Sequence, residues 1–229
     1  MTYCREHTAV KFENANRIAV SLRCRAWTCE DCVEMRKKQL ICQGFAGAPN
    51  LFITLTHRYS KLFTPGEAAR RLSWAWRLCR LRLMRKHKLK HLPFLAVIEK
   101  HKSGWPHIHI LARARYIPFA EISAIMKELI DSPRVRIEAI RNRSKMHGYC
   151  VKYCSKATEK FETAKRYWQS RDYDIRDPSE LDIHPKEPGN WMIEAQSVWN
   201  LAQLWENLGG KVEFISAYKA ILLKIDVFR

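Results

Sequence analysis

The stretch VIEKHKSGWPHIHIL, from Val97 to Leu111, decides the fold because it joins two apolar runs through a polar turn. In the second run His107 and His109 alternate with isoleucines, and this period of two predicts a β-strand with both imidazoles on one face. Glu99 ends the first run, LPFLAVIE, and His101–Gly104 supplies the turn residues. We therefore predict a β-hairpin that brings Glu99 beside the two histidines.

Two histidines and a carboxylate on paired strands can converge on one metal ion. Three such ligands leave coordination positions open, which suits a catalytic divalent ion better than a closed structural site. The sequence thus predicts a metal site made by His107, His109 and Glu99. The alternative is a buried pair of histidines held by hydrogen bonds, because this short pattern also occurs in strands that bind no metal.

A second candidate metal site lies in the segment LRCRAWTCEDC, which contains three cysteines: Cys24, Cys29 and Cys32. Short spacings of this kind let one loop wrap thiolates around a tetrahedral Zn²⁺ ion. We predict Cys4 as the fourth ligand, with His7 and Cys42 as alternatives, and a structural zinc knuckle within residues 1–45. A cluster of free thiols is the competing interpretation.

The composition favours a globular protein that binds a polyanion. Of 229 residues 47% are hydrophobic, and 41 lysines and arginines against 23 acidic residues give a net charge of +18. Nucleic acid is the commonest polyanion, and an acidic membrane surface is the competing partner. No apolar run reaches the roughly 18 residues of a membrane span, and the first residues lack the apolar core of a signal peptide. We expect a cytoplasmic protein without membrane association, whose eight cysteines are thiols or metal ligands.

The order of predicted elements between residues 46 and 170 indicates the fold class. A buried strand, LFITLTHR, precedes an amphipathic helix that opens with a capping box made by Thr64 and Glu67, and the hairpin strands follow. A second amphipathic helix, FAEISAIMKELID, and an alternating strand, RVRIEAI, complete the series. This is the order of a ferredoxin-like α+β domain, with both helices on one face of a central antiparallel sheet and the other face free for a site.

The C-terminal part, residues 171–229, is predicted to be a small extension of unknown role. It opens with a polar, proline-containing segment that is typical of a linker or wrapping loop. A helix with Trp199 and Trp205 follows, then a break at Gly209–Gly210, and then a strand or a second helix.

The segment YCVKYCSK carries two tyrosines at helical spacing, Tyr149 and Tyr153. Residues four apart lie on the same side of a helix, about 6 Å apart along its axis. Lys152 and Lys156 repeat this spacing. By itself the pattern is typical of an amphipathic helix with packed tyrosines and solvated lysines. Together with the metal motif, it indicates a tyrosine nucleophile beside a Lewis acid.

The motifs FITLT, GWPHIHIL and YCVKYCSK, in this order, resemble the HUH superfamily of rolling-circle replication initiators. The doubled YxxK pattern is similar to that of two-tyrosine initiators from small single-stranded DNA phages and related plasmids. The resemblance covers residues 50–170. It implies that Mg²⁺ or Mn²⁺ is held by His107, His109 and Glu99, with His101 as a competing third ligand.

The resemblance also implies that Tyr149 and Tyr153 are nucleophiles and that Lys152 and Lys156 are their lysine partners. The expected reaction is cleavage of single-stranded origin DNA, which leaves a 5′-phosphotyrosine link and a 3′-OH that a host DNA polymerase can extend. A second tyrosine would allow the strand to be rejoined when rolling-circle replication ends. Because the chain has no GxxxxGK[ST] motif, a host helicase is expected as a further partner.

Two rival functions remain compatible with the sequence. A transposase or relaxase built on the HUH core would share the nicking chemistry, although relaxases usually place the tyrosine before the histidines and here it follows them. A non-catalytic, zinc-stapled DNA- or RNA-binding regulator would use the histidines and tyrosines as core residues and would form no covalent adduct.

Overall fold

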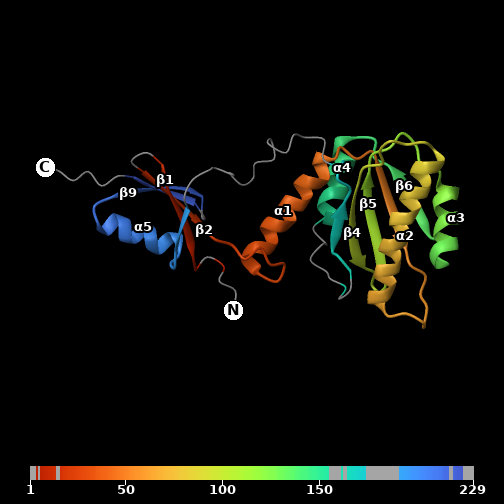
Figure 1. The fold of residues 1–229 in the computed structure, drawn as a ribbon, viewed down its shortest axis with the longest axis horizontal. Coiled ribbons are helices and arrows are strands. Elements are labelled where there is room, and N and C mark those ends of the chain that lie inside the picture. The colour runs from red at the N-terminus through yellow and green to blue at the C-terminus, as the bar shows by residue number, and fades with distance from the viewer. Residues whose placement is uncertain are drawn as a thin grey trace. The chain divides into compact units, whose positions relative to one another are not determined.

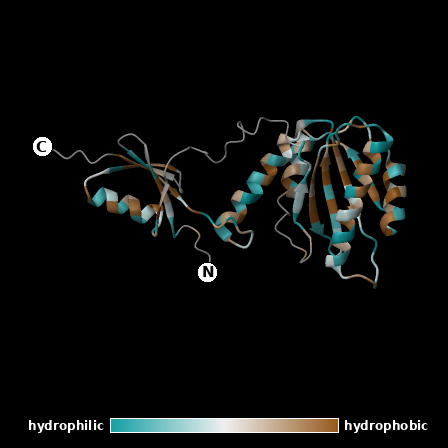
Figure 2. Ribbon diagram, viewed as in Figure 1, coloured by the Kyte–Doolittle hydropathy of each residue, from teal (hydrophilic) through white to brown (hydrophobic). Residues whose placement is uncertain are grey.

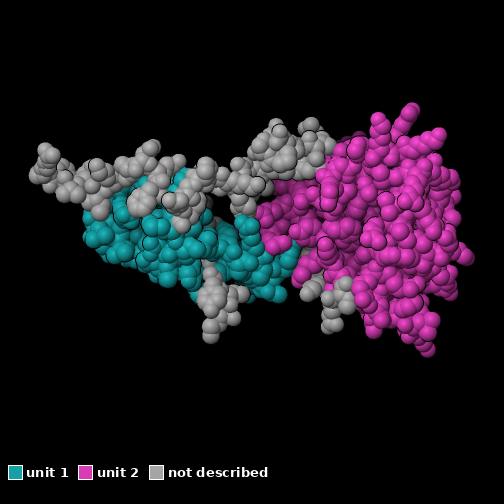
Figure 3. Space-filling model, viewed as in Figure 1, with its two compact units in different colours: residues 1–34, 182–229 teal, residues 35–181 magenta. Residues whose placement is uncertain are grey.

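The computed structural model describes residues 4, 6–13, 16–154, 161, 164–173, 191–216 and 219–223 (Figure 1). The chain forms two compact units, one of residues 1–34 with 182–229 and the other of residues 35–181 (Figure 3). Both units are α+β with antiparallel sheets. The sequence suggested boundaries after residues 45 and 170, because it carries no local signal of the pairing between distant strands. No helix within the described ranges is both long and apolar enough to cross a bilayer.

The larger unit, residues 35–181, has the order of elements that the sequence predicts. After α1 (Glu30–Ala46) come β3 (Leu51–Thr56), α2 (Pro65–Lys86), β4 (Phe94–Lys100), β5 (Pro106–Ala112), α3 (Phe119–Ile130), β6 (Val135–Ala139), α4 (Arg143–Tyr149), the π-helix η1 (Cys150–Cys154) and β7 (Tyr167–Gln169). The five strands form one antiparallel sheet in the order β6-β3-β5-β4-β7. Strand, helix, two strands, helix and strand therefore follow one another from β3 to β6.

Helix α2 begins where the capping box predicts. Thr64 Oγ1 accepts a hydrogen bond from the backbone N–H of Glu67 at 3.2 Å, and the Glu67 carboxylate accepts one from the backbone N–H of Thr64 at 2.8 Å. One stripe of the helix is buried: Ala68, Ala69, Leu72, Ala75, Trp76, Cys79 and Leu83. This stripe and the apolar side of α3 pack on one face of the sheet, whose strands are strongly hydrophobic (Figure 2).

The opposite face of the sheet meets the end of α1 and the α4–η1 segment. A Cβ added at Gly44 of α1 would lie 3.0 Å from Sγ of Cys150 and 3.4 Å from Cδ1 of Leu111 on β5. The Tyr173 hydroxyl donates a hydrogen bond to the Gly44 carbonyl at 2.8 Å. The absence of a side chain at Gly44 therefore lets the helix approach the strand and the tyrosine-bearing segment closely.

We expect Gly47→Ala to lower the free energy of unfolding by about 1–3 kcal/mol, the usual range for overpacking. A Cβ at Gly47 would overlap the ring of Tyr173, which is fully buried. Urea unfolding followed by circular dichroism measures the change. Gly148→Ala is the matched control, because nothing lies within 4 Å of its Cβ position. Equal stability of the two variants would contradict this account of the packing.

The smaller unit holds a second antiparallel sheet in the order β8-β1-β2-β10-β9. Its elements are β1 (Thr8–Glu13), β2 (Asn16–Ser21), β8 (Trp191–Glu194), α5 (Val198–Asn207), β9 (Lys211–Ser216) and β10 (Lys219–Leu223). Because β8 pairs with β1 and β10 pairs with β2, the C-terminal segment completes a sheet begun by the first strands. The predicted helix ends before Gly209–Gly210, and a strand rather than a second helix follows.

Candidate active site

The two histidines lie on the sheet face opposite α2 and α3. Ile108 and Ile110 of β5 belong to the core beneath these helices, so the alternating His107 and His109 point to the other face. Their ring centroids are 6.3 Å apart and the rings are nearly parallel, at 12°. The period of two thus places both imidazoles side by side, as the sequence predicts.

Two threonines on β3 orient the imidazole rings. Thr54 lies opposite His109 in the β3–β5 register, and Thr56 lies opposite His107. Thr54 Oγ1 is 3.2 Å from Nδ1 of His109, and Thr56 Oγ1 is 2.9 Å from Nδ1 of His107. A hydrogen bond at Nδ1 fixes the ring and makes Nε2 the ligand atom. The sequence analysis gave these threonines no role, although the alternation in LFITLT is the signal that places them on this face.

Glu99 reaches the histidines from β4. It lies opposite His107 in the β4–β5 register, and its Oε2 is 2.7 Å from Nε2 of His109, with both side chains largely buried. His101, the competing third ligand, lies in the hairpin turn. Its ring centroid is 4.7 Å from that of His107, and its Nδ1 is 3.2 Å from Oγ of Ser103. The hairpin therefore brings together the histidines and the carboxylate on one face.

The donor types of this group fit a divalent ion. Two imidazole nitrogens and one carboxylate oxygen share a face, and Nδ1 of both rings already has a hydrogen-bond partner. The ligand atoms of Glu99, His107 and His109 are more widely spaced than those of a closed site. Among the described residues, a group of four cysteines is the one set of three or more ligand atoms within 4.8 Å of one another. Ion binding would replace the bond between His109 and Glu99.

Both tyrosines pack over the histidine face. Tyr149 ends α4, and Tyr153 lies in η1. The ring of Phe52 stacks against both, with centroid distances of 4.3 Å to Tyr149 and 4.6 Å to Tyr153. The Tyr153 ring also contacts that of His109, at 4.1 Å between centroids. The residue predicted to be a nucleophile therefore touches a residue predicted to bind metal.

Two cysteines orient the tyrosine-bearing helix. Cys150 and Cys154 each follow a tyrosine in the sequence, and both are fully buried next to Gly44. Burial raises the pKa of both thiols, to about 12 for Cys150, so they pack as neutral groups. The segment winds as a π-helix, a conformation that is often found at functional sites.

Glu138 distinguishes the environment of Tyr149. The Tyr149 hydroxyl donates a hydrogen bond to Oε2 of Glu138 at 2.8 Å, and Nε of Arg136 lies 3.0 Å from Oε1 of the same carboxylate. The bond to Glu138 raises the pKa of Tyr149 above its ordinary value, because ionisation would place two negative charges together. The sequence analysis missed Glu138. The alternation in RVRIEAI, which places Arg136 and Glu138 on one face, is the signal that indicates it.

One predicted lysine partner lies beside Tyr153. Nζ of Lys152 is 5.1 Å from the centroid of the Tyr153 ring, within the range of a cation–π interaction. Lys156, the second predicted partner, lies outside the described residues.

The strands and helices that carry these side chains coincide with a known family. Residues 50–158 match the family model of replication-associated protein ORF2. The matched range runs from β3 through η1 and contains both histidines and both tyrosines, and it supports a Rep-type replication initiator. No curated protein and no solved structure matches the chain.

The cysteines predicted to bind zinc form a cluster in the smaller unit. Four Sγ atoms lie within 4.8 Å of one another: those of Cys4, Cys24, Cys29 and Cys32. Sγ of Cys32 is 3.4 Å from that of Cys4 and 3.8 Å from that of Cys24. The predicted fourth ligand, Cys4, belongs to the group, whereas the alternatives His7 and Cys42 do not. Four thiolates at this spacing suit a tetrahedral Zn²⁺ ion.

Proposed function

We propose that this protein is an HUH-type replication initiator that nicks and rejoins single-stranded origin DNA by tyrosine transesterification. The observation that carries the proposal is the contact between Tyr153 and His109 on the sheet face opposite α2 and α3. It lies within residues 50–158, which match a replication-associated family. The strand order β6-β3-β5-β4 and the element order from β3 to β6 support a ferredoxin-like core.

The proposed reaction exchanges one phosphoester for another. The Tyr153 oxygen attacks phosphorus and forms an O–P bond, and the bond from phosphorus to the 3′ oxygen of the preceding nucleotide breaks. The phenol proton passes to the released 3′ oxygen through solvent, so the products are a 5′-phosphotyrosine and a 3′-OH. A host polymerase could extend this 3′-OH after a host helicase opens the duplex. Reversal by a 3′-OH rejoins the strand without ATP, because the covalent link retains the phosphoester.

The remaining side chains bind and orient the phosphate. His107, His109 and Glu99 would hold Mg²⁺ or Mn²⁺, which when bound supplies Lewis-acid stabilisation of phosphate charge. The threonine hydrogen bonds on β3 keep the imidazole rings in place as ligands. The Lys152 ammonium, near the Tyr153 ring, can neutralise charge that develops on the phosphate in the transition state.

We assign the first attack to Tyr153 and a later attack to Tyr149. The Tyr149 hydroxyl is bound to Glu138, and its raised pKa keeps it protonated near neutral pH. Tyr153 instead lies directly on His109 and beside Lys152. A tyrosine held by a carboxylate suits the second cleavage, which must wait until the first covalent link has formed.

A covalent-adduct assay tests the proposed function. The full-length protein is incubated with 3′-labelled single-stranded oligonucleotides that tile candidate origins, with Mn²⁺ or with EDTA, and is then denatured and separated on a gel. We expect a labelled band, dependent on the metal, at the mass of the protein plus DNA. Firm binding without an adduct on any substrate would contradict nicking and favour a non-catalytic nucleic-acid-binding protein.

We expect Glu138→Gln to shift the reactivity of Tyr149 to lower pH. The carboxylate now holds the pKa of Tyr149 above its ordinary value, and a neutral amide removes the repulsion that opposes ionisation. The measurement is the pH profile of adduct formation in a Tyr153→Phe background, where Tyr149 is the remaining nucleophile. Glu213→Gln, at an exposed position of β9, is the control. An unchanged or upward-shifted profile would show that Glu138 does not restrain Tyr149.

A further inference from the structure

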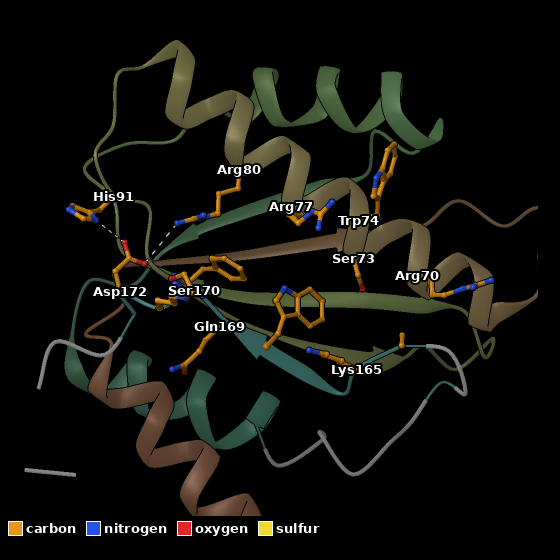
Figure 4. Close-up of a pocket in the computed structure, with 14 residues that line it drawn as sticks. Arg70, Ser73, Trp74, Arg77, Arg80, His91, Lys165, Gln169, Ser170 and Asp172 are labelled. Carbon is orange, nitrogen blue, oxygen red and sulfur yellow. Dashed lines mark hydrogen bonds and ion pairs between the residues drawn. The ribbon is translucent and has the colours of Figure 1, made fainter. Parts of the chain in front are cut away.

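We propose that a cationic, aromatic groove on the helix-covered face of the sheet binds the single-stranded DNA that flanks the cleavage site. The groove is a cavity of about 810 Å³ between α2 and residues 164–172 (Figure 4). It exists because α2 and α3 pack over β5 and β6, while β7 extends the sheet beyond β4. Binding by the groove does not depend on the proposed nicking, but its connection to a cleavage site does.

The charge of the groove favours an anionic ligand. Five cations line it: Arg70, Arg77, Arg80, Lys165 and Arg171. The one carboxylate among its described lining residues, Asp172, is already bonded to His91 at 3.0 Å and lies 3.9 Å from Arg80. Figure 4 shows these three side chains together at one end, with Arg70 and Lys165 at the other. The described residues offer no ion pair to Arg77, Lys165 or Arg171, so these cations are available to phosphates.

The aromatic side chains favour nucleic acid over an acidic peptide. Trp74 projects from α2 with 45% of its surface exposed, and Trp168 on β7 and Phe94 on β4 also line the groove. Indole rings among cations provide what an unpaired strand needs, because bases stack on the rings while arginines and lysines contact the backbone. A duplex hides its base faces, and an acidic peptide has none. The groove chemistry therefore selects an unpaired strand.

Two further cavities extend the groove into a track longer than one nucleotide. A cavity of about 440 Å³ shares Arg70 and Trp74 with it and adds Phe63 and Arg71. A third, of about 560 Å³, shares Phe63 and Arg71 and reaches the loop after β3.

The far end of this track lies next to the strand that carries the histidines. The exposed Tyr59 in the loop after β3 stacks at 5.0 Å on Trp105, whose Nε1 donates a hydrogen bond to the carbonyl of Arg58 at 3.1 Å. Trp105 is two residues before His107, at the start of β5. A strand lying in the track would therefore lead from the groove to the end of the sheet that holds the proposed cleavage site.

Trp74→Ala and Arg77→Glu test the groove in the full-length protein. Binding of fluorescent oligo(dT) of about 6 and about 30 nucleotides is measured by anisotropy in EDTA, since one single-strand site covers about 4–16 nucleotides. We expect Trp74→Ala to weaken binding of the long strand about tenfold, with little change for the short one. Arg77→Glu should also reduce the slope of log affinity against log salt by about 0.7, the loss of one phosphate contact.

Tyr116→Ala and Arg115→Glu are the matched controls, because both residues are exposed and line none of the three cavities. Several results would overturn the proposal: long-strand binding unchanged in the groove variants, equal losses in the controls, equal losses for duplex DNA, or a mononucleotide that binds with the same dependence on Trp74. Adduct formation is scored separately. Binding that depends on Trp74 without any adduct refutes nicking alone, and an adduct without that dependence refutes the groove alone.

Discussion

Tyr153→Phe is expected to reduce adduct formation by about 10⁴-fold or more, the usual loss when a nucleophile is removed. Phenylalanine keeps the ring that stacks on Phe52 and His109 but removes the oxygen that would attack phosphorus. Tyr149→Phe should leave the first cleavage nearly intact, because the Tyr149 hydroxyl is bound to Glu138 and remains protonated. The two variants therefore separate the first nucleophile from the second.

Single-turnover adduct formation on one oligonucleotide measures the first step, and release of rejoined DNA measures the second. Tyr149→Phe should accumulate the adduct and rejoin slowly, whereas the double variant should bind DNA normally and form no adduct. Tyr116→Phe, at an exposed position away from the sheet site, controls for the substitution itself. A fast Tyr153→Phe and an inactive Tyr149→Phe would reverse the assigned order. Cleavage by the double variant would refute both nucleophiles.

The part of the site that the sequence predicts consists of residues placed by local periodicity. Alternation in β5 puts His107 and His109 on one face, and the hairpin turn brings Glu99 to them. Helical spacing gathers Tyr149 and Tyr153 over that face. These arrangements depend on strand and helix geometry over short distances, which the order of residue types expresses directly.

The features that the sequence does not predict depend on pairings between distant segments. Glu138 reaches Tyr149 only because β6 lies beside β3, with Phe52 opposite Glu138 in the register. Nothing in the polar segment after residue 170 indicates that β8 and β10 join β1 and β2. The groove beside α2 likewise depends on β7 being added at the edge of the sheet. A pattern of residue types does not encode these choices, because several edges would satisfy the same apolar alternation.

Cys32→Ser is expected to abolish binding of one Zn²⁺ per chain and to unfold the smaller unit. Its buried apolar cluster contains few side chains: Val10, Ala19, Val198, Ala220 and Leu222. A core of this size gives little stabilisation, and small units commonly depend on a metal. Structural zinc contributes about 10–16 kcal/mol of apparent binding free energy at neutral pH. Cys32 is fully buried at the centre of the cluster, near both Cys4 and Cys24, so its loss removes the best-enclosed ligand.

Metal content by mass spectrometry and amide hydrogen exchange of β1 and β2 measure the two effects. Cys42→Ser is the control, because Cys42 is exposed and lies outside the cluster. It should retain one zinc and protected amides, and a zinc chelator should reproduce the Cys32→Ser result in the unmodified protein. Amides of β3 and β5 should stay protected in every case, since the larger unit has its own core. One zinc retained by Cys32→Ser, or protection lost equally in both sheets, would show that the cysteines do not stabilise the smaller unit as a zinc site.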